Sequence, residues 1–114
     1  MTNNTAHKEP AAGWDIGGAH LKAVLMSRQG LVIDALQLPC PLWKGLDHLS
    51  SAVAAVLERF GPVSRHGVTM TGELADLFAT RKEGVQKLIA AMESLLCDGD
   101  IRFYAGTRGL VDGT

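Results

Sequence analysis

The sequence predicts an α/β domain with a mixed sheet and elements in the order βββαβαβ. Two observations lead to this prediction. The first third of the chain holds short apolar runs separated by turn residues, whereas the rest holds two longer segments with apolar residues at helical spacing, each followed by another short apolar run. Strands joined by tight turns run antiparallel, and strands joined through a helix run parallel. A mixed sheet with helices covering it follows from this order.

Three strands are expected in the first part of the folded chain, at residues 11–16, 20–27 and 31–38. Glycine-containing turns separate them, which predicts an antiparallel meander. Pro39 and Pro41 follow the third strand and are expected to end it, because proline cannot donate a hydrogen bond to a sheet ladder.

Two amphipathic helices are expected at residues 46–60 and 83–97. In each, the apolar side chains fall on one helical face, and a glycine follows shortly after the last turn. A short strand follows each helix, at residues 65–71 and 101–104. These two helix–strand units supply the parallel part of the sheet.

Length and composition favour one globular domain. A chain of 114 residues, 46% of them hydrophobic, is long enough to bury about two thirds of its unfolded surface. Residues 1–10 are polar and are expected to be a disordered leader, so the folded domain is expected over residues 11–114. The net charge of −1 argues against a nucleic-acid partner, and no apolar run is long enough for a membrane-spanning helix. Cys40 and Cys97 form no CxxC pair, so we expect buried free thiols in a cytoplasmic protein.

The most informative segment is WDIGGAHLKAVLMSR, in which Asp15 ends a short apolar strand and two glycines follow. This layout suits a phosphate and its magnesium ion, with Asp15 binding the metal. Gly17 and Gly18 would let backbone N–H groups approach phosphate oxygens, and Lys22 would add a positive charge. The segment is not a Walker A loop, because a strand-like run follows the glycines in place of a helix. The alternative is a plain hairpin turn with no ligand between Asp15 and Lys22.

A second polar segment, VTMTGELADLFATRKEGV, begins in the strand expected at residues 65–71 and continues beyond it. Polar groups that follow the carboxyl end of a strand in an α/β sheet face a crevice. We expect Thr71 to bind a phosphate oxygen, Glu73 to hold a metal-bound water or accept a proton, and Asp76 to orient a substrate amine. Arg81 could reach a diphosphate through its planar guanidinium group. The alternative is that these groups cap the next turn or are solvated.

Two further side chains are candidates for ligand contacts. His20 lies in the hairpin and could contact a phosphate, although a partly buried strand histidine is the expected outcome. Trp43 could form an aromatic wall for a furan or phenol ring. We expect instead that it packs its loop onto the sheet, because tryptophan usually buries most of its ring.

The strand order resembles the ribonuclease H-like unit of the acetate and sugar kinase, heat-shock protein 70 and actin superfamily, in which the first hairpin binds phosphate. Asp15, Gly17 and Lys22 fit its pattern D-x-G-x-x-x-x-K. More narrowly, GWDIGGAHLKAV and TGELAD resemble hydantoinase A/oxoprolinase-related proteins of the tetrahydromethanopterin-linked C1 transfer group, and this resemblance covers residues 13–111.

The narrower resemblance implies an enzyme of methanofuran-type cofactor biosynthesis. Such an enzyme condenses a furanylmethyl diphosphate with a tyramine-type amine or phenol and releases pyrophosphate, with Mg²⁺ as its cofactor. ATP-dependent oxoprolinase-like or kinase chemistry is the second reading, and a noncatalytic nucleotide-sensing or assembly module is the third. The superfamily site lies between two domains, and a second glycine-rich phosphate motif is missing from this sequence. We therefore expect a fragment of a longer two-domain protein that is inactive alone, and a homo-oligomer is left open.

Overall fold

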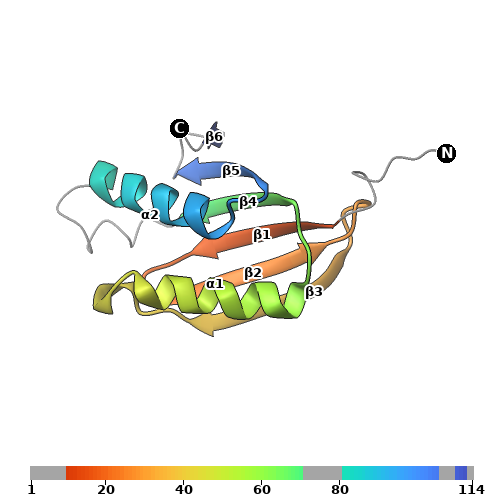
Figure 1. Cartoon of the computed structure of the whole chain (residues 1–114), viewed down its shortest axis with the longest axis horizontal. Helices are drawn as coiled ribbons and strands as arrows, with labels where there is room; N and C mark the ends of the chain where they lie inside the picture. Colours follow the sequence, from red (N-terminus) through yellow and green to blue (C-terminus); the bar gives the residue numbers. More distant parts are fainter. Residues whose placement is uncertain (1–9, 71–80, 106–109, 113–114) are drawn as a thin grey trace.

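The computed structural model describes residues 10–70, 81–105 and 110–112, with side chains described for residues 10–70 and 82–103. These residues form a six-stranded sheet in the order β3-β2-β1-β4-β5-β6, with helices packed against it (Figure 1). The strands are β1 (Ala11–Ile16), β2 (His20–Met26), β3 (Val32–Pro39), β4 (Arg65–Met70), β5 (Asp100–Ala105) and β6 (Leu110–Asp112). The helices are the short 3₁₀ helix η2 (Leu42–Lys44), α1 (Asp47–Phe60) and α2 (Arg81–Leu95).

The predicted order βββαβαβ and the mixed sheet are confirmed, and η2 and β6 are additional elements. The strand pairs β1–β2 and β2–β3 are antiparallel, whereas β1–β4 and β4–β5 are parallel. The third strand ends at Pro39, as expected, although Pro39 is itself the last residue of β3 and pairs with His20. Since β3 lies at the edge of the sheet, a residue without an N–H group is tolerated there.

Both helices cover the same face of the sheet, as Figure 1 shows, and α1 and α2 contact each other there. In β1, Ala12, Trp14 and Ile16 are buried under this layer, while the alternate residues point to the opposite face. No helix in the described part of the chain lies over that opposite face, which we call the open face. None of the described helices is long and apolar enough to cross a membrane.

Helix α1 is closed by a glycine and tied to the sheet by an ion pair. Gly61 adopts φ +78°, which favours glycine, and its N–H donates to the Leu57 carbonyl at 2.9 Å. The Arg59 guanidinium donates to both carboxylate oxygens of Asp34 on β3, at 2.8 and 2.9 Å. These hydrogen bonds from Arg59 lower the pKa of Asp34. The last turn of α1 is thereby fixed to the edge strand.

One buried hydrogen bond joins β1 to β4 inside the core. The Trp14 indole Nε1–H donates to Nδ1 of His66 at 3.1 Å, and the two side chains are 2% and 5% exposed. Because Nδ1 accepts this bond, the neutral imidazole carries its proton on Nε2. Burial lowers the pKa of His66, against a hydrogen bond with the backbone of Val63 that raises it. The core therefore requires the neutral ring.

The His66 geometry predicts a stability that falls on acidification. Since the pKa of His66 is lower in the folded chain than its ordinary value of 6.5, the unfolded chain binds more protons between the two values. The contribution of neutral His66 to the free energy of unfolding is then fully present above pH 6.5. It decreases as the pH falls toward the folded pKa, by at most about 1.4 kcal/mol per pH unit for one proton. Urea unfolding from pH 8 to pH 5 measures this slope. His66→Gln, whose amide oxygen can accept the indole bond without titrating, should flatten it; an unchanged slope in this variant would assign the effect to other groups.

The two cysteines differ in exposure. Cys40 is buried, as expected, and burial raises the pKa of its thiol. Cys97 follows the end of α2 and is exposed, so the expectation that both thiols are buried was wrong. Both thiols are free.

Candidate functional site

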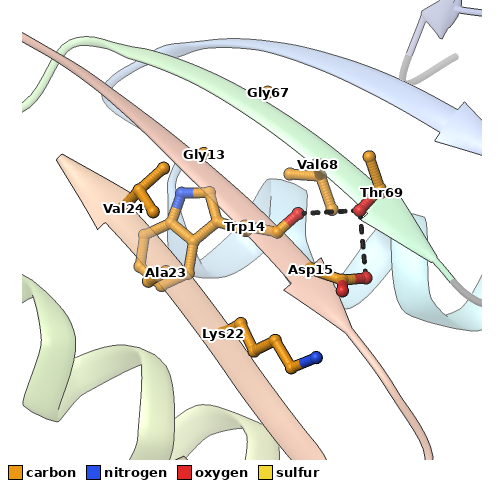
Figure 2. Close-up of a pocket in the computed structure, with 9 residues that line it drawn as sticks. All are labelled: Gly13, Trp14, Asp15, Lys22, Ala23, Val24, Gly67, Val68 and Thr69. Atoms are coloured by element: carbon orange, nitrogen blue, oxygen red, sulfur yellow. Dashed lines mark hydrogen bonds between the residues drawn. The ribbon is translucent and has the colours of Figure 1, made fainter. Parts of the chain in front are cut away.

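A carboxylate and a hydroxyl group are in contact on the open face where β1 and β4 end, and an ammonium group lies on the neighbouring strand. Asp15 is the penultimate residue of β1, and the sheet register pairs it with Lys22 on β2 and with Thr69 on β4. The Thr69 hydroxyl lies 3.0 Å from Oδ1 of Asp15 and 3.3 Å from the Trp14 carbonyl, both of which can accept its proton (Figure 2). All three side chains point away from the helices because each alternates with buried neighbours.

The Lys22 side chain reaches toward Asp15 without pairing with it. Its ammonium group lies on the same side of the sheet as the carboxylate (Figure 2), and within the described ranges no ion pair of 4.0 Å or less joins the two. Lys22 is exposed, so its charge can contact an anion from solvent. A carboxylate and an ammonium group side by side can bind the metal and the oxygens of one metal–phosphate complex.

A shallow hollow of about 350 Å³ adjoins this cluster on the open face. Its floor contains Gly13 and Gly67, which pair across β1 and β4 and leave the sheet without side chains at both positions. Val24 borders the hollow on the β2 side (Figure 2). A methyl group added at Gly67 would meet nothing within 4 Å, whereas one at Gly13 would lie 3.1 Å from Val24 Cγ2. The hollow therefore has a flat backbone floor with the charged cluster at one end.

The glycine hairpin forms as the sequence predicts, although one amide is already engaged. The Gly17 N–H donates to the His20 carbonyl at 3.0 Å and closes the turn between β1 and β2. The Gly18 carbonyl accepts a bond from the Leu42 N–H at 3.2 Å. A phosphate contact through the Gly17 amide would have to replace its turn bond, and phosphate binding at Gly17 and Gly18 stays a prediction.

The oxygen atoms of the cluster are suitable ligands for Mg²⁺, and one carboxylate supplies their negative charge. Asp15 and Thr69 offer a carboxylate and a hydroxyl oxygen, which are hard ligands of the kind that Mg²⁺ prefers. Among the described residues, no group of three or more His, Cys, Asp or Glu side chains could hold a metal ion. So sparse a donor set suits a Mg²⁺ ion that keeps several waters and takes its other oxygens from a bound ligand.

The predicted site residues of the second polar segment lie outside the described residues. This applies to Thr71, Glu73 and Asp76, whose roles stay predictions. Arg81 begins α2, but its side chain is also outside the described set.

Two structural findings correct the expected packing around the site. His20 is exposed at the start of β2, and the expectation of a partly buried histidine was wrong. Trp43 is 64% exposed, so it does not anchor its loop by burying its ring.

Thr69 is the site residue that the sequence reasoning missed. It lies between Val68 and Met70, both buried, so strand alternation places its hydroxyl on the open face. The alternation was visible in the sequence. What was missing was the parallel register that sets Thr69 beside Asp15.

Solved structures define the class of this fold. An exopolyphosphatase from Cytophaga hutchinsonii matches with a TM-score of 0.60 at 14% identity, over 88% of this chain and 35% of its own. A Ppx/GppA phosphatase from Aquifex aeolicus matches with a TM-score of 0.55 at 10% identity, over 86% of this chain and 36% of its own. A protein from C. hutchinsonii assigned as a sugar kinase also reaches 0.55, at 14% identity, over 84% and 36%. The chain therefore has the fold of an actin-like ATPase domain, and identities this low establish the fold alone.

A curated protein similar in sequence is (4-{4-[2-(gamma-L-glutamylamino)ethyl]phenoxymethyl}furan-2-yl)methanamine synthase of Methanocaldococcus jannaschii. The two are 33% identical over 81 residues, which is 71% of this chain and 23% of the synthase. The chain thus spans about a quarter of the length of this relative. No protein-family model matches the chain. The name of the synthase describes a product in which a phenoxy oxygen is joined through a methylene group to a furan ring.

Proposed function

We propose that this chain supplies the diphosphate-binding domain of an enzyme that condenses a furanylmethyl diphosphate with a tyramine-type phenol and releases pyrophosphate. The observation that carries the proposal is the cluster of Asp15, Lys22 and Thr69 beside the hollow on the open face. The similarity to the furan-methanamine synthase supports the choice of substrates. On this proposal the enzyme acts in the biosynthesis of a methanofuran-type one-carbon cofactor.

The proposed reaction is a substitution at the furan methylene carbon. The phenol oxygen forms a new C–O bond as the bond from that carbon to the diphosphate oxygen breaks, and pyrophosphate leaves with the bonding electron pair. The phenol proton passes to a base, a role that the sequence predicts for Glu73. Lys22 would pair with the charge that develops on the leaving group. Asp15, held by Thr69, would bind Mg²⁺, which when present offsets the same charge.

ATP-dependent chemistry is a second candidate because the fold matches phosphatases and a protein assigned as a sugar kinase. The same cluster would then hold the terminal phosphates of ATP, and a substrate acid, amide or hydroxyl group would be phosphorylated. The resemblance of the sequence to oxoprolinase-related proteins fits this candidate equally well.

A product assay separates the two candidates. The chain, and any longer polypeptide that contains it, is incubated with Mg²⁺ and either ATP or furan-2-ylmethyl diphosphate plus tyramine. We expect the longer polypeptide to release pyrophosphate in equal amount to the furanylmethyl ether formed, and only when both organic substrates are present.

The comparison between the two polypeptides is the control for this assay. Alone, the chain is expected to bind Mg²⁺–pyrophosphate without turnover, because a two-domain site would be incomplete. Phosphate release from ATP in the absence of the diphosphate would instead favour the second candidate. Binding with no reaction in either polypeptide would favour a noncatalytic sensing or assembly module.

A further inference from the structure

The connection between β3 and α1 presents an exposed aromatic ring. Trp43, in η2, is 64% exposed, although the residues around it in sequence include the buried Cys40 and Leu42. A tryptophan ring is among the largest apolar surfaces that a side chain can bury, and it usually does so. The loop is therefore packed against the core while its largest side chain is left in solvent.

The loop that carries Trp43 is held by its own hydrogen bonds. The Lys44 N–H donates to the Pro41 carbonyl at 2.9 Å, and the Gly45 N–H donates to the Leu42 carbonyl at 3.0 Å. Gly45 adopts φ +142°, a conformation that L side chains rarely take, and so permits the turn into α1. Such a turn fixes the backbone of Trp43, so a ring bound against its indole would cost little backbone ordering.

The same loop is bonded directly to the glycine hairpin. The Cys40 N–H donates to the Ala19 carbonyl at 2.8 Å, and the Leu42 N–H donates to the Gly18 carbonyl at 3.2 Å. Trp43 therefore directly follows Leu42, whose backbone is hydrogen-bonded to the turn between β1 and β2. Two of the three cluster residues, Asp15 and Lys22, lie on the strands that this turn connects.

A positive charge accompanies the ring. The Lys44 ammonium lies 5.0 Å from the centroid of the Trp43 ring, within the range of a cation–π interaction. Lys22, on β2 of the hairpin, adds a second exposed ammonium group. An aromatic surface beside one exposed lysine, on a loop bonded to the hairpin that carries another, complements a ligand that has both an aromatic ring and an anionic group.

We propose that Trp43 is a stacking platform for the aromatic ring of a small phosphorylated ligand whose phosphate is bound at the hairpin. The inference rests on the proposed function, which supplies the phosphate end of the ligand, and it adds the contact that would recognise the ring. Lys44 keeps the indole oriented in the free protein and pairs with the anionic end of the bound ligand.

Two probes of matched charge test the platform separately from the phosphate site. The chain is titrated by calorimetry, with Mg²⁺ present, against pyrophosphate and against furan-2-ylmethyl diphosphate. We expect the furan-bearing probe to bind roughly two- to tenfold more tightly than pyrophosphate, which is the range expected for one aromatic pair. Trp43→Ala should remove that difference and leave the pyrophosphate affinity within twofold, whereas Trp43→Phe should keep most of it.

Fluorescence gives a second readout of the same event. Trp14 is buried and Trp43 is exposed, so a ring stacked on Trp43 should change the emission of the exposed indole. This change should follow the furan-bearing probe, not pyrophosphate, and should be lost in Trp43→Phe. Leu31→Ala is the matched control, because Leu31 is 69% exposed in the turn before β3 and far from the hairpin of β1 and β2 along the sheet.

Each outcome decides the inference. Pyrophosphate binding without a preference for the furan, or a preference that survives Trp43→Ala, would overturn the platform and leave the proposed function standing. Binding of the furan-bearing probe through Trp43 without any pyrophosphate affinity would support the platform and contradict the proposed function. Absence of binding by both probes at millimolar concentration would overturn both. A dimer in sedimentation velocity that Trp43→Ala converts to monomer would make the ring a contact between copies of the chain and would also overturn the platform.

Discussion

Asp15→Asn is expected to lower the affinity of the chain for Mg²⁺–pyrophosphate by about 100-fold or more, and on the proposed function it should lower the rate of a longer polypeptide by a similar factor. Metal-ion stabilisation of a developing charge is worth several kcal/mol, and each ~1.4 kcal/mol is a factor of ten. The substitution removes the charge while its amide oxygen can still accept the Thr69 hydroxyl, which lies 3.0 Å from Oδ1 in the native chain. The midpoint of thermal unfolding should therefore stay within a few degrees of the native value. Calorimetric titration and thermal unfolding of the same preparation measure both effects.

The controls for Asp15→Asn distinguish the loss of a carboxylate at the site from the loss of a carboxylate elsewhere on the surface. Asp98→Asn removes an exposed carboxylate that follows α2, away from the hairpin, and should leave the affinity unchanged. Thr69→Val keeps the branched shape of the side chain and removes only its hydroxyl, so a smaller loss of about tenfold is expected, as for one hydrogen bond to a charged group. If Asp15→Asn binds Mg²⁺–pyrophosphate as tightly as the native chain, Asp15 has no part in metal or phosphate binding.

The sequence was sufficient to predict the hairpin half of the site. Alternation along β1 and β2 sets the faces of Asp15 and Lys22, and a tight turn at the two glycines fixes their register. Thr69 was not predicted, because its position beside Asp15 depends on the parallel pairing of β1 with β4, and these strands are far apart in the sequence. Local patterns carry no information about which residue of one parallel strand faces a given residue of another.

The sheet has an open face because of its strand order, which the local sequence pattern does not determine. Helix α1 connects β3 to β4, and α2 connects β4 to β5, so both connections advance across the sheet in the same direction. Right-handed crossovers that advance in the same direction place their helices on the same face. The sequence predicts both helices, but the strand order is needed to know that they share a face and that neither of them covers Gly13 and Gly67.

Trp43 shows where a general tendency fails. Tryptophan is usually buried, and this tendency predicted that its ring packs the loop onto the sheet. In the structure Leu42 and Cys40 fill that role, at 6% and 0% exposure, and the turn between Pro41 and Gly45 directs the indole outward. Which of several neighbouring apolar residues is buried depends on the turn geometry, which composition does not determine.

Trp14→Ala is expected to destabilise the domain by about 3–5 kcal/mol, the usual cost of deleting a large buried aromatic side chain. Trp14 is 2% exposed on a central strand of the sheet. Because small domains are stable by only about 5–15 kcal/mol, this variant should be largely unfolded in mild urea. Trp14→Phe retains most of the apolar volume but leaves Nδ1 of His66 without its donor, so a loss of roughly 1–3 kcal/mol is expected. Urea unfolding at pH 7.5, where His66 is neutral in both states, measures these differences.

A double-mutant cycle tests whether the Trp14–His66 bond itself holds β1 against β4. The cycle combines Trp14→Phe with His66→Leu, and we expect their effects to differ from additivity by about 0.5–3 kcal/mol, because the two groups are in direct contact at 3.1 Å. Leu49→Ala is the matched core control. Leu49 is buried in the first turn of α1, and its substitution should be additive with His66→Leu. Since Asp15 follows Trp14 on β1 and Thr69 lies on the same strand as His66, a strong coupling would mean that the buried bond also keeps the site residues in register. Additive effects within about 0.5 kcal/mol would instead assign that register to the backbone ladder alone.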